Sequence, residues 1–166
     1  AVLCTTTASS VNADNLSSVS VDDREAGERA IDYLVSNGHK KIGIIGGDIE
    51  SVCATGLRFI GCKNSLERNG ISFDLSFFEK AEFDFESSYA AAQRLIKRKP
   101  ELTAVFAMSD TMAIGAIRAL EDLGLSVPDD VSVLGFDGID YACFSNPRIT
   151  TYKQPQDEIA ELTVRL

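Results

Sequence analysis

Residues 131–137 read VSVLGFD, and residues 41–48 read KIGIIGGD. Each stretch is a run of β-favouring residues that leads to a glycine and then to an aspartate. Neither run alternates apolar with polar residues, as a strand with one face in water would. Strands buried on both faces have this pattern, and they are typical of parallel sheets covered by helices. These two stretches therefore favour an α/β fold.

Strand-like and helix-like segments alternate along the whole chain. Strands are predicted at residues 2–6, 17–21, 42–45, within 76–83, and at 104–108, 131–136 and 149–152. Helices are predicted at about 24–37, 57–70, 86–96, 110–124 and 156–166. Such alternation requires crossover connections, so the strands run parallel and helices cover both faces. The predicted fold class is a doubly wound α/β fold with a mostly parallel sheet.

The composition limits which partners this chain can bind. Its 166 residues are enough for one domain or one lobe of a larger one, and 45% of them are hydrophobic. The net charge is −9, because 25 Asp and Glu outnumber 16 Lys and Arg. A protein that grips nucleic acid needs clustered cations, so we expect this chain not to bind DNA by itself. No apolar run approaches the length of a membrane span, and we expect no membrane partner.

Catalytic and metal-binding motifs are missing from the sequence. The four cysteines form no C-x-x-C pair, and His39 is the single histidine. The nucleophile elbow G-x-S-x-G, the dinucleotide loop G-x-G-x-x-G and the phosphate loop G-x-x-x-x-G-K-[ST] do not occur. We therefore expect no metal site, no cofactor and no enzymatic activity, and rank a doubly wound enzyme last among the alternatives.

Three side chains are candidates for binding a small polar molecule. In open parallel sheets, ligands bind beyond the carboxyl ends of the strands, and Phe83 and Asp137 follow predicted strands. Arg58 falls in the first turns of a helix after such a strand. An arginine fork, a carboxylate and an aromatic face together suit a polyol. Three ordinary roles remain open: a surface cation for Arg58, core packing for Phe83 and turn formation for Asp137. Asp48 is interpreted as a turn residue.

Four motifs, taken together, are specific to one protein family. They are GHKKI at 38–42, SDTMAIGA at 109–116, VPDDVSVLGFD at 127–137 and PRITTYKQP at 147–155. With them, essentially the whole chain resembles the effector-binding domain of LacI/GalR-type bacterial transcription regulators. The fold of that domain is that of the periplasmic sugar-binding proteins.

The resemblance implies two similar lobes with a small effector between them, and an N-terminal helix-turn-helix that reads an operator as a dimer. By comparison with the family, residues 1–21 would be the tail of the N-terminal lobe, and residues 22–150 the C-terminal effector-binding lobe. Residues 151–166 would be a crossover strand and the start of the return to the first lobe. The chain would then be a fragment without the helix-turn-helix and most of the N-terminal lobe, and operator DNA a partner only through those missing parts.

The resemblance also assigns roles to individual residues. Arg58 matches the family arginine that binds effector hydroxyls or carboxylates, Asp137 matches the aspartate that accepts from the effector, and Phe83 matches an aromatic that stacks on it. Ser109 occupies a position where the family commonly has Asn, and Gln154 lies in the crossing strand beside the cleft.

The family also pairs its subunits through the helix of Met112 and Ile114 and a neighbouring helix around Tyr89, so the resemblance implies a homodimer. Packing of Met112 and Ile114 on the sheet is the alternative. Val52 and Ala54 stand where purine-binding members tend to have polar groups, which favours a sugar as effector. The resemblance thus implies a cytoplasmic repressor or other regulator that senses a sugar. A periplasmic sugar-binding protein of a transport system is the alternative.

Overall fold

The computed structural model describes residues 2–4, 17–50 and 53–166. Two expectations, the end of the predicted strand 2–6 and the role of Val52, lie outside these residues. The large part of the described chain is a five-stranded parallel sheet in the order β4-β3-β5-β6-β7. Its strands are β3 (Ile42–Gly46), β4 (Phe78–Lys80), β5 (Ala104–Ala107), β6 (Ser132–Asp137) and β7 (Thr150–Lys153). The prediction of a mostly parallel α/β sheet is confirmed.

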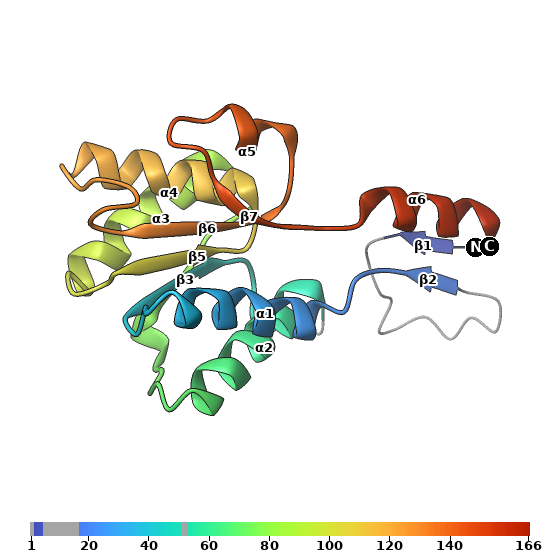
Figure 1. Ribbon diagram of the computed structural model, residues 1–166, viewed down its shortest axis with the longest axis horizontal. Coiled ribbons are helices and arrows are strands. Elements are labelled where there is room, and N and C mark those ends of the chain that lie inside the picture. The colour runs from blue at the N-terminus through green and yellow to red at the C-terminus, as the bar shows by residue number, and fades with distance from the viewer. Residues whose placement is uncertain (1, 5–16, 51–52) are drawn as a thin grey trace.

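Helices cover both faces of this sheet (Figure 1). One face carries α1 (Asp23–Ser36) and α2 (Ala54–Arg68), and the other carries α3 (Phe85–Arg98) and α4 (Asp110–Asp122). The central strands β3 and β5 are buried along their whole length, as their unbroken apolar runs predicted. Two short elements, η1 (Leu75–Phe77) and α5 (Asp140–Phe144), were not predicted, because elements of this length show no helical period.

A smaller part of the chain lies beside the sheet (Figure 1). It pairs β1 (Val2–Cys4) in parallel with β2 (Ser17–Val19), and α6 (Gln156–Arg165) packs on both strands. Within the described residues the chain passes between the two parts twice, from β2 into α1 and from β7 into α6. Both crossings reach the sheet at the edge where its strands have their carboxyl ends.

Two glycines bring the backbones of α1 and α2 into direct contact. A Cβ atom on Gly27 would lie 2.1 Å from the carbonyl oxygen of Arg58, and one on Gly61 would lie 2.0 Å from that of Arg24. No side chain fits at these distances, so both positions require glycine. The close contact fixes α2 against the first turns of α1.

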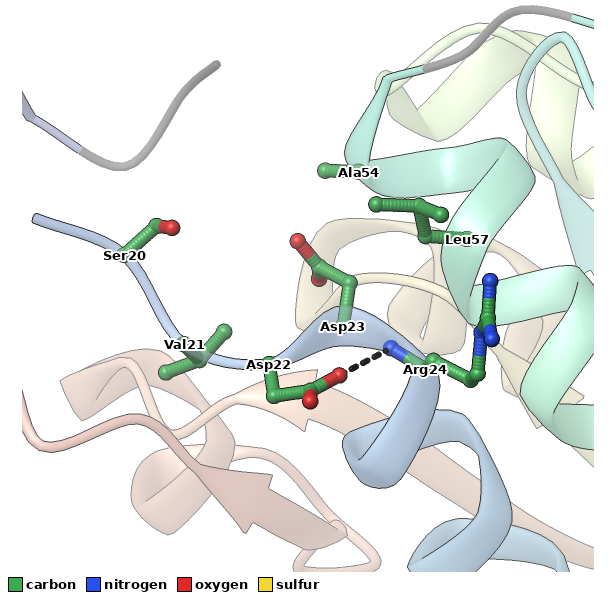
Figure 2. Close-up of a pocket in the computed structure, with 7 residues that line it drawn as sticks. All are labelled: Ser20, Val21, Asp22, Asp23, Arg24, Ala54 and Leu57. Atoms are coloured by element: carbon green, nitrogen blue, oxygen red, sulfur yellow. Dashed lines mark hydrogen bonds between the residues drawn. The ribbon is translucent and has the colours of Figure 1, made fainter. Parts of the chain in front are cut away.

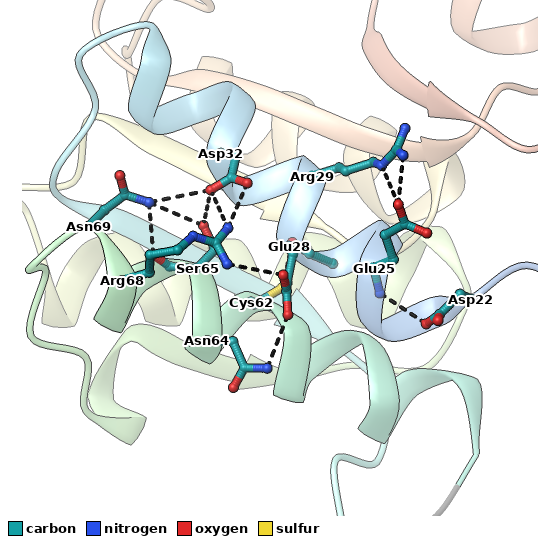
Figure 3. A network of polar contacts seen from close by, with 11 residues as sticks. Asp22, Glu25, Glu28, Arg29, Asp32, Cys62, Asn64, Ser65, Arg68 and Asn69 are labelled. Carbon is teal, nitrogen blue, oxygen red and sulfur yellow. Dashed lines mark hydrogen bonds and ion pairs between the residues drawn. The ribbon is translucent and has the colours of Figure 1, made fainter.

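Polar side chains hold the same helix pair together at its surface. The guanidinium of Arg68 lies 3.1 Å from a carboxylate oxygen of Glu28 and 2.8 Å from one of Asp32 (Figure 3). Ser65 donates a hydrogen bond of 2.6 Å to Asp32. Exposed ion pairs stabilise little on their own, so we regard the glycine contact as the main constraint and this network as its support.

The glycine contact can be tested by substitution. Gly27→Ala should lower the free energy of unfolding by about 2–4 kcal/mol, because its methyl group would overlap the backbone of α2. Urea denaturation measures this loss. Glu67→Ala, at an exposed position of α2, is the control and should change stability by less than about 0.5 kcal/mol. Equal stability of Gly27→Ala and the wild type would show that the helices are not in contact here.

Candidate functional site

The candidate site lies where the crossing from β2 meets the strand ends of the large sheet. A hollow of about 450 Å³ opens there, lined by Ser20, Val21, Asp22, Asp23, Arg24, Ala54 and Leu57. The Asp23 side chain points to the α2 side of this hollow and the Asp22 side chain to the opposite side (Figure 2). Asp22 caps α1, since its carboxylate accepts from the backbone N–H groups of Arg24 and Glu25. Asp23 is not needed as a cap, so its carboxylate can bind another partner.

Arg58 is a buried cation fixed on three sides. Only 6% of the residue is exposed. Its Nε and one terminal nitrogen donate to the same oxygen of Asp23, at 3.2 and 2.6 Å, and the other terminal nitrogen donates to the Met108 carbonyl at 2.7 Å. The interpretation of Arg58 as a surface cation is wrong, because α2 directs the side chain inward over the sheet.

One of two stacked aromatic rings packs against the guanidinium of Arg58. The guanidinium carbon of Arg58 lies 3.5 Å from the ring centroid of Phe136, the residue before Asp137. The ring of Phe136 also stacks on Tyr152, with centroids 5.1 Å apart and an angle of 5° between the planes. A guanidinium stacked on an aromatic face is held in one plane, so its remaining N–H groups point in defined directions.

Asp137 ends β6 in a conformation that is unusual for a residue with a side chain. Its φ is 116°, in the region that favours glycine. Gln154 holds it from the crossing segment: the amide of Gln154 donates to the Asp137 carboxylate at 2.6 Å, and its backbone N–H donates to the Asp137 carbonyl at 3.1 Å. Burial raises the pKa of Asp137, opposed by the Gln154 hydrogen bond and the charge of Arg58. Strain and an unfavourably buried charge at one residue are typical of functional positions.

A second carboxylate, Asp110, fixes the turn that follows Asp137. It is fully buried at the start of α4. One of its oxygens accepts from the backbone N–H groups of Gly138 and Ile139, both at 2.8 Å, and the other accepts from the Thr151 hydroxyl at 2.5 Å. Asp110 therefore ties α4, the turn after β6 and strand β7 together at the strand-end edge.

The remaining predicted positions lie at the same edge of the sheet. Phe83 is 52% exposed, so core packing is wrong for it, and its ring covers Gly47, where an added Cβ atom would lie 2.9 Å from the ring. Ser109 is buried and caps α4 by accepting from the Met112 backbone N–H at 3.1 Å. Its role as an effector ligand stays a prediction. Asp48 accepts from the Glu50 backbone N–H at 3.0 Å, which confirms it as a turn residue.

One predicted dimer residue is placed in the core. Met112 has no exposed surface and packs in the core on the inner side of α4. This side chain therefore cannot contact a second subunit, and the prediction for it is wrong. The helical period explains the error, since Met112 lies on the side of α4 that faces the sheet. Ile114 and Tyr89 are partly exposed.

Comparison with known proteins agrees with the parallel α/β fold. The family of periplasmic binding protein-like domains matches residues 31–166. Transcription regulators of the LacI type are its relatives in sequence and in structure. The chain belongs to the family of periplasmic binding protein-like domains. Among the described residues of this LacI-type domain, every helix is too short or too polar to cross a membrane.

Three relatives illustrate the similarity. The HTH-type transcriptional regulator MalR of Clostridium butyricum is 38% identical over 151 residues, which are 90% of this chain and 44% of that protein. A complex of the transcriptional regulator CelR with cellobiose is 33% identical with a TM-score of 0.84, covering 94% of this chain and 49% of the other. A sugar-binding LacI-family regulator of Escherichia coli in complex with phosphate is 30% identical with a TM-score of 0.83, covering 89% and 52%. The LacI-type domain thus spans about half the length of these relatives.

Three residues of this site were not predicted from the sequence: Asp23, Asp110 and Phe136. Asp23 and Asp110 each directly follow a polar residue at a helix start, Asp22 and Ser109. In each pair the first residue is the cap, and the second turns inward to a partner far away in the sequence. The doubled polar residue at a helix start was the available signal, because one cap needs only one side chain.

The three hydrogen bonds that Asp110 accepts, here called the Asp110 clamp, predict different losses of stability for its Ala and Asn variants. Asp110→Ala should lower the free energy of unfolding by about 3 kcal/mol or more, because three donors lose their acceptor inside the LacI-type domain. Asp110→Asn should cost less, since the amide can accept both N–H bonds and donate to Thr151. Urea unfolding of both variants tests this order, with the exposed Asp129→Ala as control. A reversed order would contradict the clamp.

Proposed function

We propose that this chain is the effector-binding and dimerisation portion of a LacI-type transcription regulator, and that it senses a small molecule, a sugar. The observation that supports this most is the convergence of Arg58 and Asp137 at one strand-end edge. Arg58 supplies donors in a fixed plane, and Asp137 supplies acceptors beside it. A sugar hydroxyl can accept from the first and donate to the second, so the pair suits adjacent hydroxyls of one ring.

The exposed ring of Phe83 adds an apolar surface at the same edge. Sugars present C–H groups on the faces of their rings, and an aromatic side chain can cover such a face. Gln154 holds Asp137 and comes from the crossing segment, so it can line the cleft while it orients the carboxylate. The relative solved with cellobiose agrees with a sugar as the type of ligand.

Signalling would follow from differential binding. An effector that contacts both lobes favours one arrangement of them, and DNA-binding heads elsewhere in the full protein respond to that arrangement. We place this regulator in the cytoplasm, where its operator is, and assign it no catalytic activity. The transport alternative is not favoured, because the relatives described above are transcription regulators.

The effector site can be tested by calorimetry on the protein with both lobes present. A panel of neutral sugars that includes cellobiose should contain a ligand. Arg58→Ala and Asp137→Ala should each weaken its binding by about tenfold to a hundredfold, because each removes charge-assisted hydrogen bonds. Asp48→Ala is the matched control, since Asp48 also follows a strand of the sheet but serves a turn. Unchanged affinity in both site variants would refute the assignment.

Dimerisation is proposed through the surface of α3, α4 and α5. Tyr89 and Ile114 are partly exposed there, Phe85 stacks on Tyr89 with centroids 6.2 Å apart, and α5 exposes Tyr141 and Phe144 by 74% and 83%. Apolar side chains that gather on one surface mark protein interfaces. A second copy of the chain is the partner that the family relationship favours.

Sedimentation equilibrium tests this surface. Ile114→Glu should convert a dimer to a monomer, because it would bury a charge between the subunits. Leu75→Glu is the control, since Leu75 is 65% exposed on η1, which meets α3 at Arg98, at the opposite end of that helix from Phe85. A wild-type monomer, or a dimer that survives Ile114→Glu, would rule out this interface.

A further inference from the structure

The charges around Arg58 restrict the class of effector. We propose that this site accepts an uncharged polyol and rejects anionic ligands such as sugar phosphates, and that Asp23 sets this choice by neutralising Arg58. The effector itself rests on the proposed function, whereas the charge selectivity is a property of these residues and can be tested without a sugar.

The hydrogen bonds of Arg58 leave part of its fork free. A guanidinium carries five N–H groups. Two of them bond to Asp23 and one bonds to the Met108 carbonyl. Within the described part of the chain, one N–H remains on each terminal nitrogen. The arginine can therefore donate two hydrogen bonds to a ligand, although its positive charge is already balanced by the carboxylate 2.6 Å away.

The surroundings of Arg58 have an excess of negative charge. Asp137 is attracted by Arg58 and repelled by Asp110 and Asp23, so the buried arginine shares this edge of the sheet with three carboxylates. The lysines and the arginine nearest this edge are exposed, so that water and salt screen their charges: Arg24, Lys80 and Lys153. Lys80 also forms an ion pair of 3.4 Å with Asp48.

These charges make the site bind hydroxyl groups more favourably than anions. A hydroxyl can accept from the free N–H groups of Arg58 and donate its own hydrogen to Asp137, so it satisfies both groups. A phosphate or carboxylate gains the same N–H bonds but meets Asp137 and Asp23 as like charges, and the buried cation that could offset them is already paired. The site therefore favours the neutral ligand of any matched pair.

Asp23→Asn removes the charge and can keep the hydrogen bonds. Both bonds from Arg58 go to a single oxygen of Asp23, and the carbonyl oxygen of an asparagine can occupy that place. Asp22→Asn is the matched control. It makes the same change of charge one residue earlier, where the side chain points away from α2 (Figure 2), and asparagine is an equally good cap for α1.

The experiment is a titration of inorganic phosphate at constant ionic strength, followed by NMR on the Arg58 Nε–H signal. Arg58→Lys identifies that signal by its loss. In the wild type and in Asp22→Asn, phosphate should leave the signal unchanged at the concentrations that saturate Asp23→Asn. In Asp23→Asn it should shift the signal with an affinity higher by about tenfold to a hundredfold, because an uncompensated guanidinium close to an anion gains that much attraction.

Each outcome decides one part of the proposal. Phosphate binding at Arg58 in the wild type would overturn it, and so would an Asp23→Asn variant that folds but binds no phosphate. If Asp23→Asn does not fold, Asp137→Asn provides the test, since it removes the next carboxylate and should give a smaller gain in phosphate affinity.

A second arm uses sugars. D-glucose and D-glucuronate form a matched pair, as do D-ribose and D-ribose 5-phosphate, and calorimetry on the two-lobed protein compares the members of each pair. An acidic member that binds the wild type more tightly than its neutral partner would contradict the selectivity. Absence of sugar binding would instead refute the proposed function, and the phosphate result would stand apart from it.

Discussion

A buried guanidinium requires a counter-charge and partners for its N–H groups, and the structure around Arg58 follows from that requirement. The exposed fraction of 6% leaves little water to solvate the charge. Asp23 supplies the counter-charge, the Met108 carbonyl takes a further N–H, and Phe136 provides a flat surface. These partners come from α1, the end of β5 and β6, so the arginine joins three elements that are far apart in the sequence.

The glycine contact between α1 and α2 is the condition for this arrangement. Asp23 lies on the first turn of α1, and Arg58 lies on α2 where a Cβ on Gly27 would meet its backbone. If a larger residue separated the helices, the carboxylate could no longer reach the guanidinium at 2.6 Å. The charge balance at Arg58 therefore depends on the packing of α1 against α2, which Gly27 and Gly61 allow because they have no side chains.

The sequence predicted the large sheet well, because its strands carry unbroken apolar runs and its helices carry regular stripes. Among the site residues, Arg58, Phe83 and Asp137 could be proposed from their places after strands, and the structure does bring them to one edge of the sheet. The partners of Arg58 and Asp137 could not be derived. Asp23 lies 35 residues from Arg58, and Thr151 lies 41 residues from Asp110, so only the tertiary fold brings them together. Met112 shows the opposite failure, since a family role was assigned to a side chain that the helical period places in the core.

The two crossings between the parts of the chain differ from ordinary linkers, because each one ends in the site. The crossing from β2 leads to Asp22 and Asp23, and the crossing from β7 continues into Gln154, which holds Asp137. A recombination boundary drawn at the limits of the large sheet would exclude Gln154, and one drawn a few residues into α1 would exclude Asp23. The large sheet is therefore not a self-contained module, because the crossings and the proposed ligand contacts share residues. The residues of the proposed effector site and the sequence of the two crossings are therefore expected to be inherited together.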